Sequence, residues 1–224
     1  MLAEIIEKLE TTTKLKQDLF NQLVAYFDNL ENTCREVASE LQAAETINNL
    51  PIRIEKVNDY EFLFRIGGDV LIFMMQSNIV RIPDEAYICK TKYLKDDISL
   101  RYFGQVLIYN FLADTITYGR LEDPGYLISR LLLNRENKFF LEGDRKIVFD
   151  FPELKVNTVT KEKNRQLVEG LVLSALNNDL LAPNFHDIMM INYHQKLEHT
   201  SSMGNPQKIG FDMFAKNREN PNPQ

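Results

Sequence analysis

Four carboxylates in the middle of the chain are the residues whose type and setting could do chemistry. Each lies in or next to a stretch with the alternating pattern of a β-strand: Asp69, Asp114, Glu142 and Asp150. Acidic side chains that meet at one end of a sheet can bind a divalent metal or act as general acid and base. A metal-dependent nuclease would also place a Glu-x-Lys triplet on the strand after the first Asp, but "AYICKTK" at 86–92 has no acid there. The four therefore stand as candidate catalytic residues of a hydrolase.

The three histidines lie near one another in the sequence, but their spacing does not suit a metal site. His186, His194 and His199 are eight and five residues apart, whereas two metal-binding histidines on one helix are typically four apart. Asp187 and Glu198 would join His194 on one face of a helix, which is also what an ordinary amphipathic helix shows. We therefore predict no metal and no cofactor.

Several motifs that mark enzymes are missing from the sequence. It has no glycine-rich loop of the kind that binds a nucleotide, and no Gly-x-Ser-x-Gly elbow for a nucleophilic serine. Cys34 and Cys89 are too few for a disulfide framework or a zinc site, so we expect two unpaired thiols. The formal net charge of −6, without any basic face, argues against binding to nucleic acid.

The elements that would position these groups begin with a long N-terminal helix. Steps of four and three residues trace a heptad in which only Thr13 and Lys16 are polar: Leu2, Ile6, Leu9, Thr13, Lys16, Phe20, Leu23, Phe27, Leu30, Cys34, Val37, Leu41 and Ala44. No Gly or Pro interrupts this pattern before Pro51. The pattern predicts an amphipathic or coiled-coil helix over residues 1–48, about 65–70 Å long at 1.5 Å per residue.

Two interpretations of this helix stay open. The heptad favours a dimer, in which four residues of the helix would contact a second copy: Phe20, Leu23, Phe27 and Leu30. A second line of apolar residues, Leu15, Leu19 and Tyr26, widens the apolar face, and a wide face favours packing on the chain's own sheet. The helix is thus either an assembly device or part of the core.

From Ile52 to Phe151 the pattern changes to that of strands. Gly67-Gly68 separates "YEFLFRI" from "VLIFMM", which predicts a tight hairpin because both glycines can adopt positive φ. Further short links follow, including a turn at "QSN" (76–78), and "AYICKTKY" (86–93) has the pattern of another strand. Short links leave no room for crossover helices, so we predict an α+β fold with an antiparallel meander of about eight strands.

The C-terminal part is predicted to be helical and then disordered. A helix capped by Thr160 should run to about Asn178 and pack on the sheet, and a weaker helix should cover 186–199, which closes an α+β domain over 49–199. Residues 200–224 are rich in Ser, Asn, Gly and Pro and are predicted to be a flexible tail. A short apolar group interrupts this tail, and we expect it to contact a partner or the chain's own surface: Ile209, Phe211, Met213 and Phe214.

These patterns favour an interaction protein over an enzyme. No apolar run is long enough to span a bilayer, and the first residues, "MLAEIIEKLE", are acidic, so we expect a soluble cytoplasmic protein. The long helix and the apolar group in the tail favour a non-catalytic interaction or assembly module that binds a second copy of itself or another protein. The alternatives are a metal-dependent hydrolase, possibly a nuclease, and a small-molecule-binding domain with its ligand between the sheet and the helices.

Overall fold

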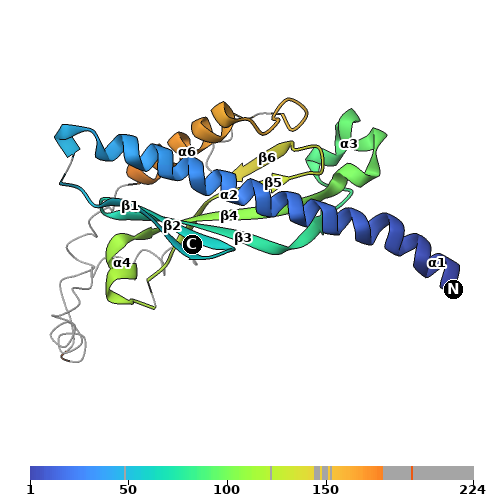
Figure 1. Ribbon diagram of the computed structural model, residues 1–224, viewed down its shortest axis with the longest axis horizontal. Helices are drawn as coiled ribbons and strands as arrows, with labels where there is room; N and C mark the ends of the chain where they lie inside the picture. The colour runs from blue at the N-terminus through green and yellow to red at the C-terminus, as the bar shows by residue number, and fades with distance from the viewer. Residues whose placement is uncertain are drawn as a thin grey trace, which may run out of the picture.

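The chain begins with one continuous helix that contains a single widened turn. The computed structural model describes residues 1–47, 49–121, 123–143, 147, 151, 153–178 and 193. In it, α1 (Leu2–Lys8) passes through the π-helical turn η1 (Leu9–Thr13) directly into α2 (Lys14–Gln42), and the helix lies along the sheet (Figure 1). A π turn holds about one more residue than an α turn, so it rotates the residues before it about the helix axis.

The strands form one antiparallel meander. Among the described residues the sheet has six strands in the order of the sequence: β1 (Ile52–Asn58), β2 (Glu61–Ile66), β3 (Asp69–Arg81), β4 (Tyr102–Leu112), β5 (Tyr126–Leu133) and β6 (Phe139–Gly143). The hairpin predicted at Gly67-Gly68 is present, since Ile66 pairs with Asp69 across it. Only Gly67 has a positive φ, at 59°, so the turn needs a glycine at its first central position.

The prediction of about eight strands is wrong: two local differences reduce the number of strands, and a third shortens a predicted strand. Residues 76–78 form no turn, because β3 continues through a bulge between Gln76 and Val80 and remains one strand. The stretch after Pro83 leaves the sheet and forms η3 (Tyr87–Lys90) and α3 (Lys92–Asp96). The long apolar run from Ile98 begins with the 3-10 turn η4 (Ile98–Arg101) and ends in the helix α4 (Ala113–Tyr118).

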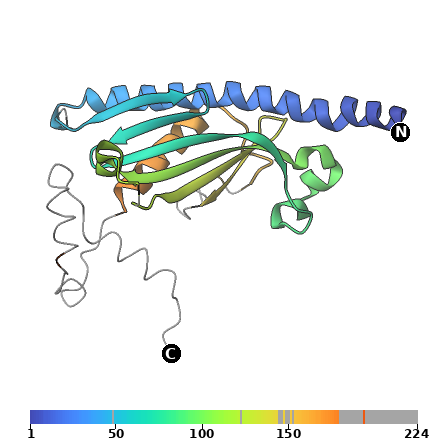
Figure 2. The same ribbon diagram turned by 90° about the horizontal axis from the view of Figure 1, so that it is seen from below.

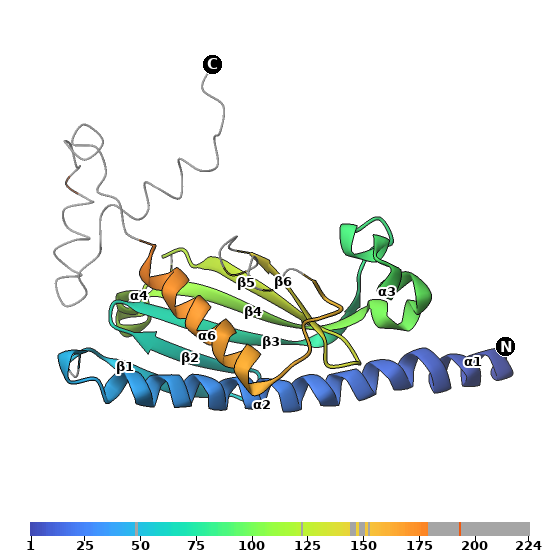
Figure 3. The ribbon, with the colours of Figure 1, turned by 90° about the horizontal axis from the view of Figure 1, so that it is seen from above.

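One face of the sheet is covered by the two longest helices. α2 and α6 (Lys161–Leu176) pack side by side on this face, and their apolar residues share one core with β2–β6 (Figure 3). The ring of Phe27 lies 5.1 Å from that of Phe62, which stacks on Phe73 at 4.5 Å. Arg165 of α6 donates two hydrogen bonds to the carboxylate of Glu40 on α2, each 2.6 Å long. Burial of this aromatic and aliphatic face stabilises the helix–sheet pair.

The opposite face of the sheet is covered only at its ends. At one end, residues 82–101, here called the end lobe, pack Ile88, Cys89 and Leu94 against the outward side chain of Leu132. At the other end, Ala113 of α4 packs with Val70 and neighbouring residues. No element of the described part of the chain covers the sheet between these two caps.

Several predicted features lie outside the described residues. These are Asp150, the tail residues Ile209, Phe211, Met213 and Phe214, and the helix expected over 186–199 apart from Tyr193. Within the described part, no helix combines the length and the apolar character needed to cross a membrane.

Candidate functional site

Three of the candidate catalytic carboxylates, Asp69, Asp114 and Glu142, lie among the described residues. Asp69 begins β3 and accepts a hydrogen bond of 3.1 Å from the side-chain amide of Asn110. Asp114 lies in the first turn of α4, and Glu142 in β6 forms an ion pair with Arg130 of the neighbouring strand. Asp69 and Glu142 thus each have a polar partner on a neighbouring strand.

The structure separates Asp69 from Glu142, while Asp150 lies outside the described residues. Glu142 pairs across the sheet with Arg130, which pairs with Leu107, which in turn pairs with Met74 of β3. Met74 is thus the residue of β3 that is level with Glu142. Asp69 lies three strands away from Glu142 and five residues before Met74. Within the described residues there is also no group of three or more His, Cys, Asp or Glu side chains that could hold a metal ion. Asp69 pairs with Leu112, two residues before Asp114, so these two carboxylates lie at the same end of the sheet, whereas Glu142 lies apart from them.

A shallow hollow of about 350 Å³ lies on the open face of the sheet beside Glu142. It is lined by Gln76, Gln105, Leu107, Tyr109, Leu127, Arg130, Glu142 and Gly143. Because Arg130 and Glu142 satisfy each other, the charged groups in its wall are already paired. This hollow is on the side of the sheet away from α2 and α6, so it is not the space between sheet and helices that was predicted to take a small molecule.

The helix residues predicted to contact a partner lie in the chain's own core. Leu23, Phe27 and Leu30 are almost completely buried against the sheet, and Phe20 packs partly on the same core. A second copy could contact these side chains only if α2 left the sheet. A partner surface on the helix therefore has to be sought on the part that the sheet does not cover.

That part is the N-terminal end of the helix, which continues past the sheet. Figure 2 shows the helix running beyond the strands and past the end lobe; residues 1–13 are here called the overhang. Neither α1 nor η1 has a buried residue, and the large apolar side chains of this segment include Leu2, Ile5, Ile6 and Leu9, which are 72%, 54%, 46% and 54% exposed. Residues at i, i+3, i+4 and i+7 share one face of a helix, so these four form an exposed apolar row.

A second hollow of about 540 Å³ lies at the base of the overhang, between the helix and the β5–β6 turn. It is lined by Glu10, Thr11, Lys14, Leu15, Asp18, Leu19, Gln22, Arg135 and Glu136. At its inner end, the amide of Gln22 donates hydrogen bonds to the carbonyl of Asn134, at 3.2 Å, and to Oδ1 of Asn137, at 2.5 Å. These bonds tie the helix to the turn at this end of the hollow, while Glu10 at the other end belongs to the overhang.

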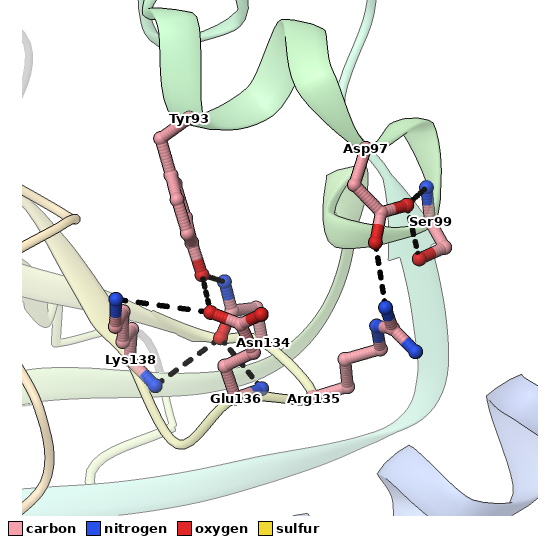
Figure 4. Close-up of polar contacts among 7 residues, drawn as sticks. All are labelled: Tyr93, Asp97, Ser99, Asn134, Arg135, Glu136 and Lys138. Carbon is pink, nitrogen blue, oxygen red and sulfur yellow. Dashed lines mark hydrogen bonds and ion pairs between the residues drawn. The ribbon is translucent and has the colours of Figure 1, made fainter.

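The wall of this hollow is held by the buried side chain of Asn134 (Figure 4). Its Oδ1 accepts hydrogen bonds from the backbone N–H groups of Glu136 and Lys138, at 3.0 and 3.1 Å. Its amide donates to the hydroxyl of Tyr93 on α3 at 2.9 Å, and that hydroxyl donates to Glu136 at 2.7 Å. One asparagine thus fixes the turn and joins it to the end lobe.

The end lobe is joined to the same turn by a second polar contact. Arg135 donates a hydrogen bond of 2.6 Å to Asp97, which also accepts from the backbone and side chain of Ser99 (Figure 4). The hydrogen bonds from Ser99, helped by Arg135, hold the pKa of the Asp97 carboxyl below its usual range. Burial, together with the hydrogen bond to Glu136, raises the pKa of Tyr93 above that of a free tyrosine. These groups satisfy one another and join the end lobe to the β5–β6 turn.

Comparison with known proteins assigns no family. No protein family and no solved structure matches the chain. Among curated proteins, the chain is similar to the protein translocase subunit SecA of Trieres chinensis, with 23% identity over 184 residues, or 72% of this chain. The chain spans only 20% of that relative's length, so the likeness does not make it a member of that family.

Proposed function

We propose that this chain is a non-catalytic protein-interaction and assembly module, and that the overhang is the part that binds the partner. The observation that carries the proposal is the apolar row of Leu2, Ile5, Ile6 and Leu9 on a helix that extends past its own sheet. A contiguous apolar surface of this kind costs free energy in water unless another surface covers it.

The energetic scale is adequate for an assembly contact. Burying one large aliphatic side chain is worth roughly 1.5–3 kcal/mol, so a row of four supplies roughly 6–12 kcal/mol before costs. Association costs roughly 4–15 kcal/mol in lost freedom, but the overhang is already helical, so little extra ordering is needed. At the favourable end of both ranges the row supports a contact of at most about micromolar affinity, to either a second copy or another protein.

Other classes of partner are disfavoured by charge. The net charge of −6 argues against nucleic acid, and the overhang carries Glu4, Glu7 and Glu10 against a single Lys8, whereas helices that bind anionic membranes are basic. Cys34 and Cys89 are both unpaired and buried, which fits the reducing conditions of the cytoplasm. We therefore place the proposed module in the cytoplasm, with a protein as its partner.

The proposal is tested by the hydrodynamic mass of three forms of the chain. Ile5→Asp combined with Leu9→Asp puts two charges into the apolar row without touching the core. Leu173→Asp is the matched control, because Leu173 is 60% exposed on α6, far along the chain from the overhang. We expect the wild type and the control to form the same assembly, both as purified protein and in extracts of the source cells, and the double variant to have monomer mass. Monomer mass for the wild type in both settings, or an unchanged assembly of the double variant, would reject the proposal.

A further inference from the structure

The exposed apolar row and the hollow at its base lie along one face of the same helix. Residues four apart are neighbours on a helix, and steps of four from Leu2 lead through Ile6 and Glu10 to Lys14, Asp18 and Gln22. The last four of these residues line the hollow, and the first two are exposed on the overhang. The helix therefore presents, along a single ridge, an apolar end and then a hollow that another helix could enter.

From this arrangement, and resting on the function proposed above, we propose that the partner is a second copy of the chain, with the two overhangs antiparallel. If the two helices cross at the level midway between Glu10 and Lys14, Glu10 of each copy lies opposite Lys14 of the other, which gives two equivalent ion pairs. The same crossing brings Leu9 opposite Leu15 of the other copy. It also carries Ile6 and Leu2 of each overhang along the hollow of the other copy, toward Asp18 and Gln22.

Two observations support a second copy over an unrelated protein. The ridge carries opposite charges four residues apart, Glu10 and Lys14, so an antiparallel copy matches it without any further group. The hollow of about 540 Å³ has Leu15 in its wall, which can contact aliphatic side chains of the incoming helix. A two-fold pairing uses both surfaces of both copies and closes on itself.

The test is a charge exchange between the two positions of the predicted ion pair. Glu10→Lys alone places two lysines opposite each other at both contacts, and Lys14→Glu alone does the same with two glutamates. We expect each single variant to raise the dimer dissociation constant about tenfold or more, since two attractive contacts become repulsive. The double variant Glu10→Lys with Lys14→Glu restores opposite charges and should return to within about threefold of the wild type.

A mixture of the two single variants gives the sharpest result. In a mixed dimer, the new lysine of one chain meets the new glutamate of the other, and the two unchanged residues also pair. We expect a fluorescently labelled Glu10→Lys chain to bind unlabelled Lys14→Glu with an affinity close to that of the wild type, measured by anisotropy. Glu4→Lys is the matched control, because Glu4 is two residues from both Leu2 and Ile6 and so faces away from the ridge. Circular dichroism melting of every variant shows that each one is folded.

The results separate this inference from the proposed function. A monomeric wild type overturns the second copy as partner, and so does a mixture that fails to bind. A second outcome is that the charge variants associate like the wild type, whereas Ile5→Asp with Leu9→Asp does not associate. This outcome overturns the antiparallel register but leaves the overhang as the interaction segment. If Ile5→Asp with Leu9→Asp also associates like the wild type, the proposed function fails as well.

Discussion

At the scale of single residues, the described polar groups are largely satisfied and some apolar ones are not. Asn110 donates to Asp69, Arg130 pairs with Glu142, and Asn134 links Tyr93 to the β5–β6 turn. The exposed apolar side chains of the overhang are in the opposite situation, since nothing in the described part of the chain covers them. This contrast supports the proposal that the overhang is a binding surface.

The hairpin at Gly67-Gly68 provides a prediction about one backbone angle. Gly67 has φ of 59°, where any side chain is strained, whereas Gly68 is not in the positive-φ region and has open space around the position of a Cβ. Gly67→Ala should therefore lower the free energy of unfolding by about 1–2 kcal/mol, and Gly68→Ala should leave it almost unchanged. Urea unfolding of both variants measures the difference. Equal effects of the two changes would show that the turn has another geometry.

At the scale of elements, the sequence predicted what is local and missed what depends on distant contacts. The long helix, the hairpin and the antiparallel order follow from periodicity and turn residues within a short window. The conformation of residues 86–93 does not follow from such a window. Ile88 and Cys89 lie in a helical turn and cover Leu132, which is more than forty residues later in the sequence. In the same way, no local pattern reveals that Asp69 and Glu142 lie three strands apart.

Gly104 provides a prediction about how closely α2 approaches the sheet. A Cβ added to Gly104 would lie 2.7 Å from Cδ2 of Leu23, which is fully buried and cannot move away. Gly104→Ala should therefore lower the free energy of unfolding by about 1–3 kcal/mol through overpacking. Gly170→Ala in α6 is the matched control: its Cβ would meet Ile147 at an ordinary 3.9 Å, and alanine should stabilise the helix by up to about 1 kcal/mol. If Gly104→Ala were neutral in thermal unfolding, the helix would have to lie further from the sheet.

At the scale of the whole molecule, the helix is longer than the sheet that it covers. Residues 2–42 span about 60 Å at 1.5 Å per residue, while the 13 residues of β3, the longest strand, span about 43 Å at 3.3 Å per residue. The excess corresponds to about a dozen helical residues at the same rise, which is the length of the overhang. The sequence shows the apolar row but not this mismatch in length, so it could not separate the assembly surface from the core surface of the helix.

The mismatch predicts that stability and assembly can be separated by a deletion. Removal of residues 1–9 takes away no buried side chain and leaves Thr11, Thr12 and Thr13 near the new end, where threonine can cap a helix. We expect the free energy of unfolding, measured at dilution where the wild type is monomeric, to change by less than about 0.5 kcal/mol. The assembly seen at higher concentration by light scattering should be lost.

Leu19→Ala is the contrasting variant for this deletion. Leu19 lies on the same helix, six residues past the overhang, and is buried at the edge of the sheet. The substitution Leu19→Ala should lower the free energy of unfolding by about 2–5 kcal/mol, because it leaves a cavity under α2. A deletion of residues 1–9 as destabilising as Leu19→Ala would mean that the overhang packs on the chain's own body. An assembly that persists without these residues would place the partner surface elsewhere, and the open face of the sheet between α4 and the end lobe would then be the next surface to mutate.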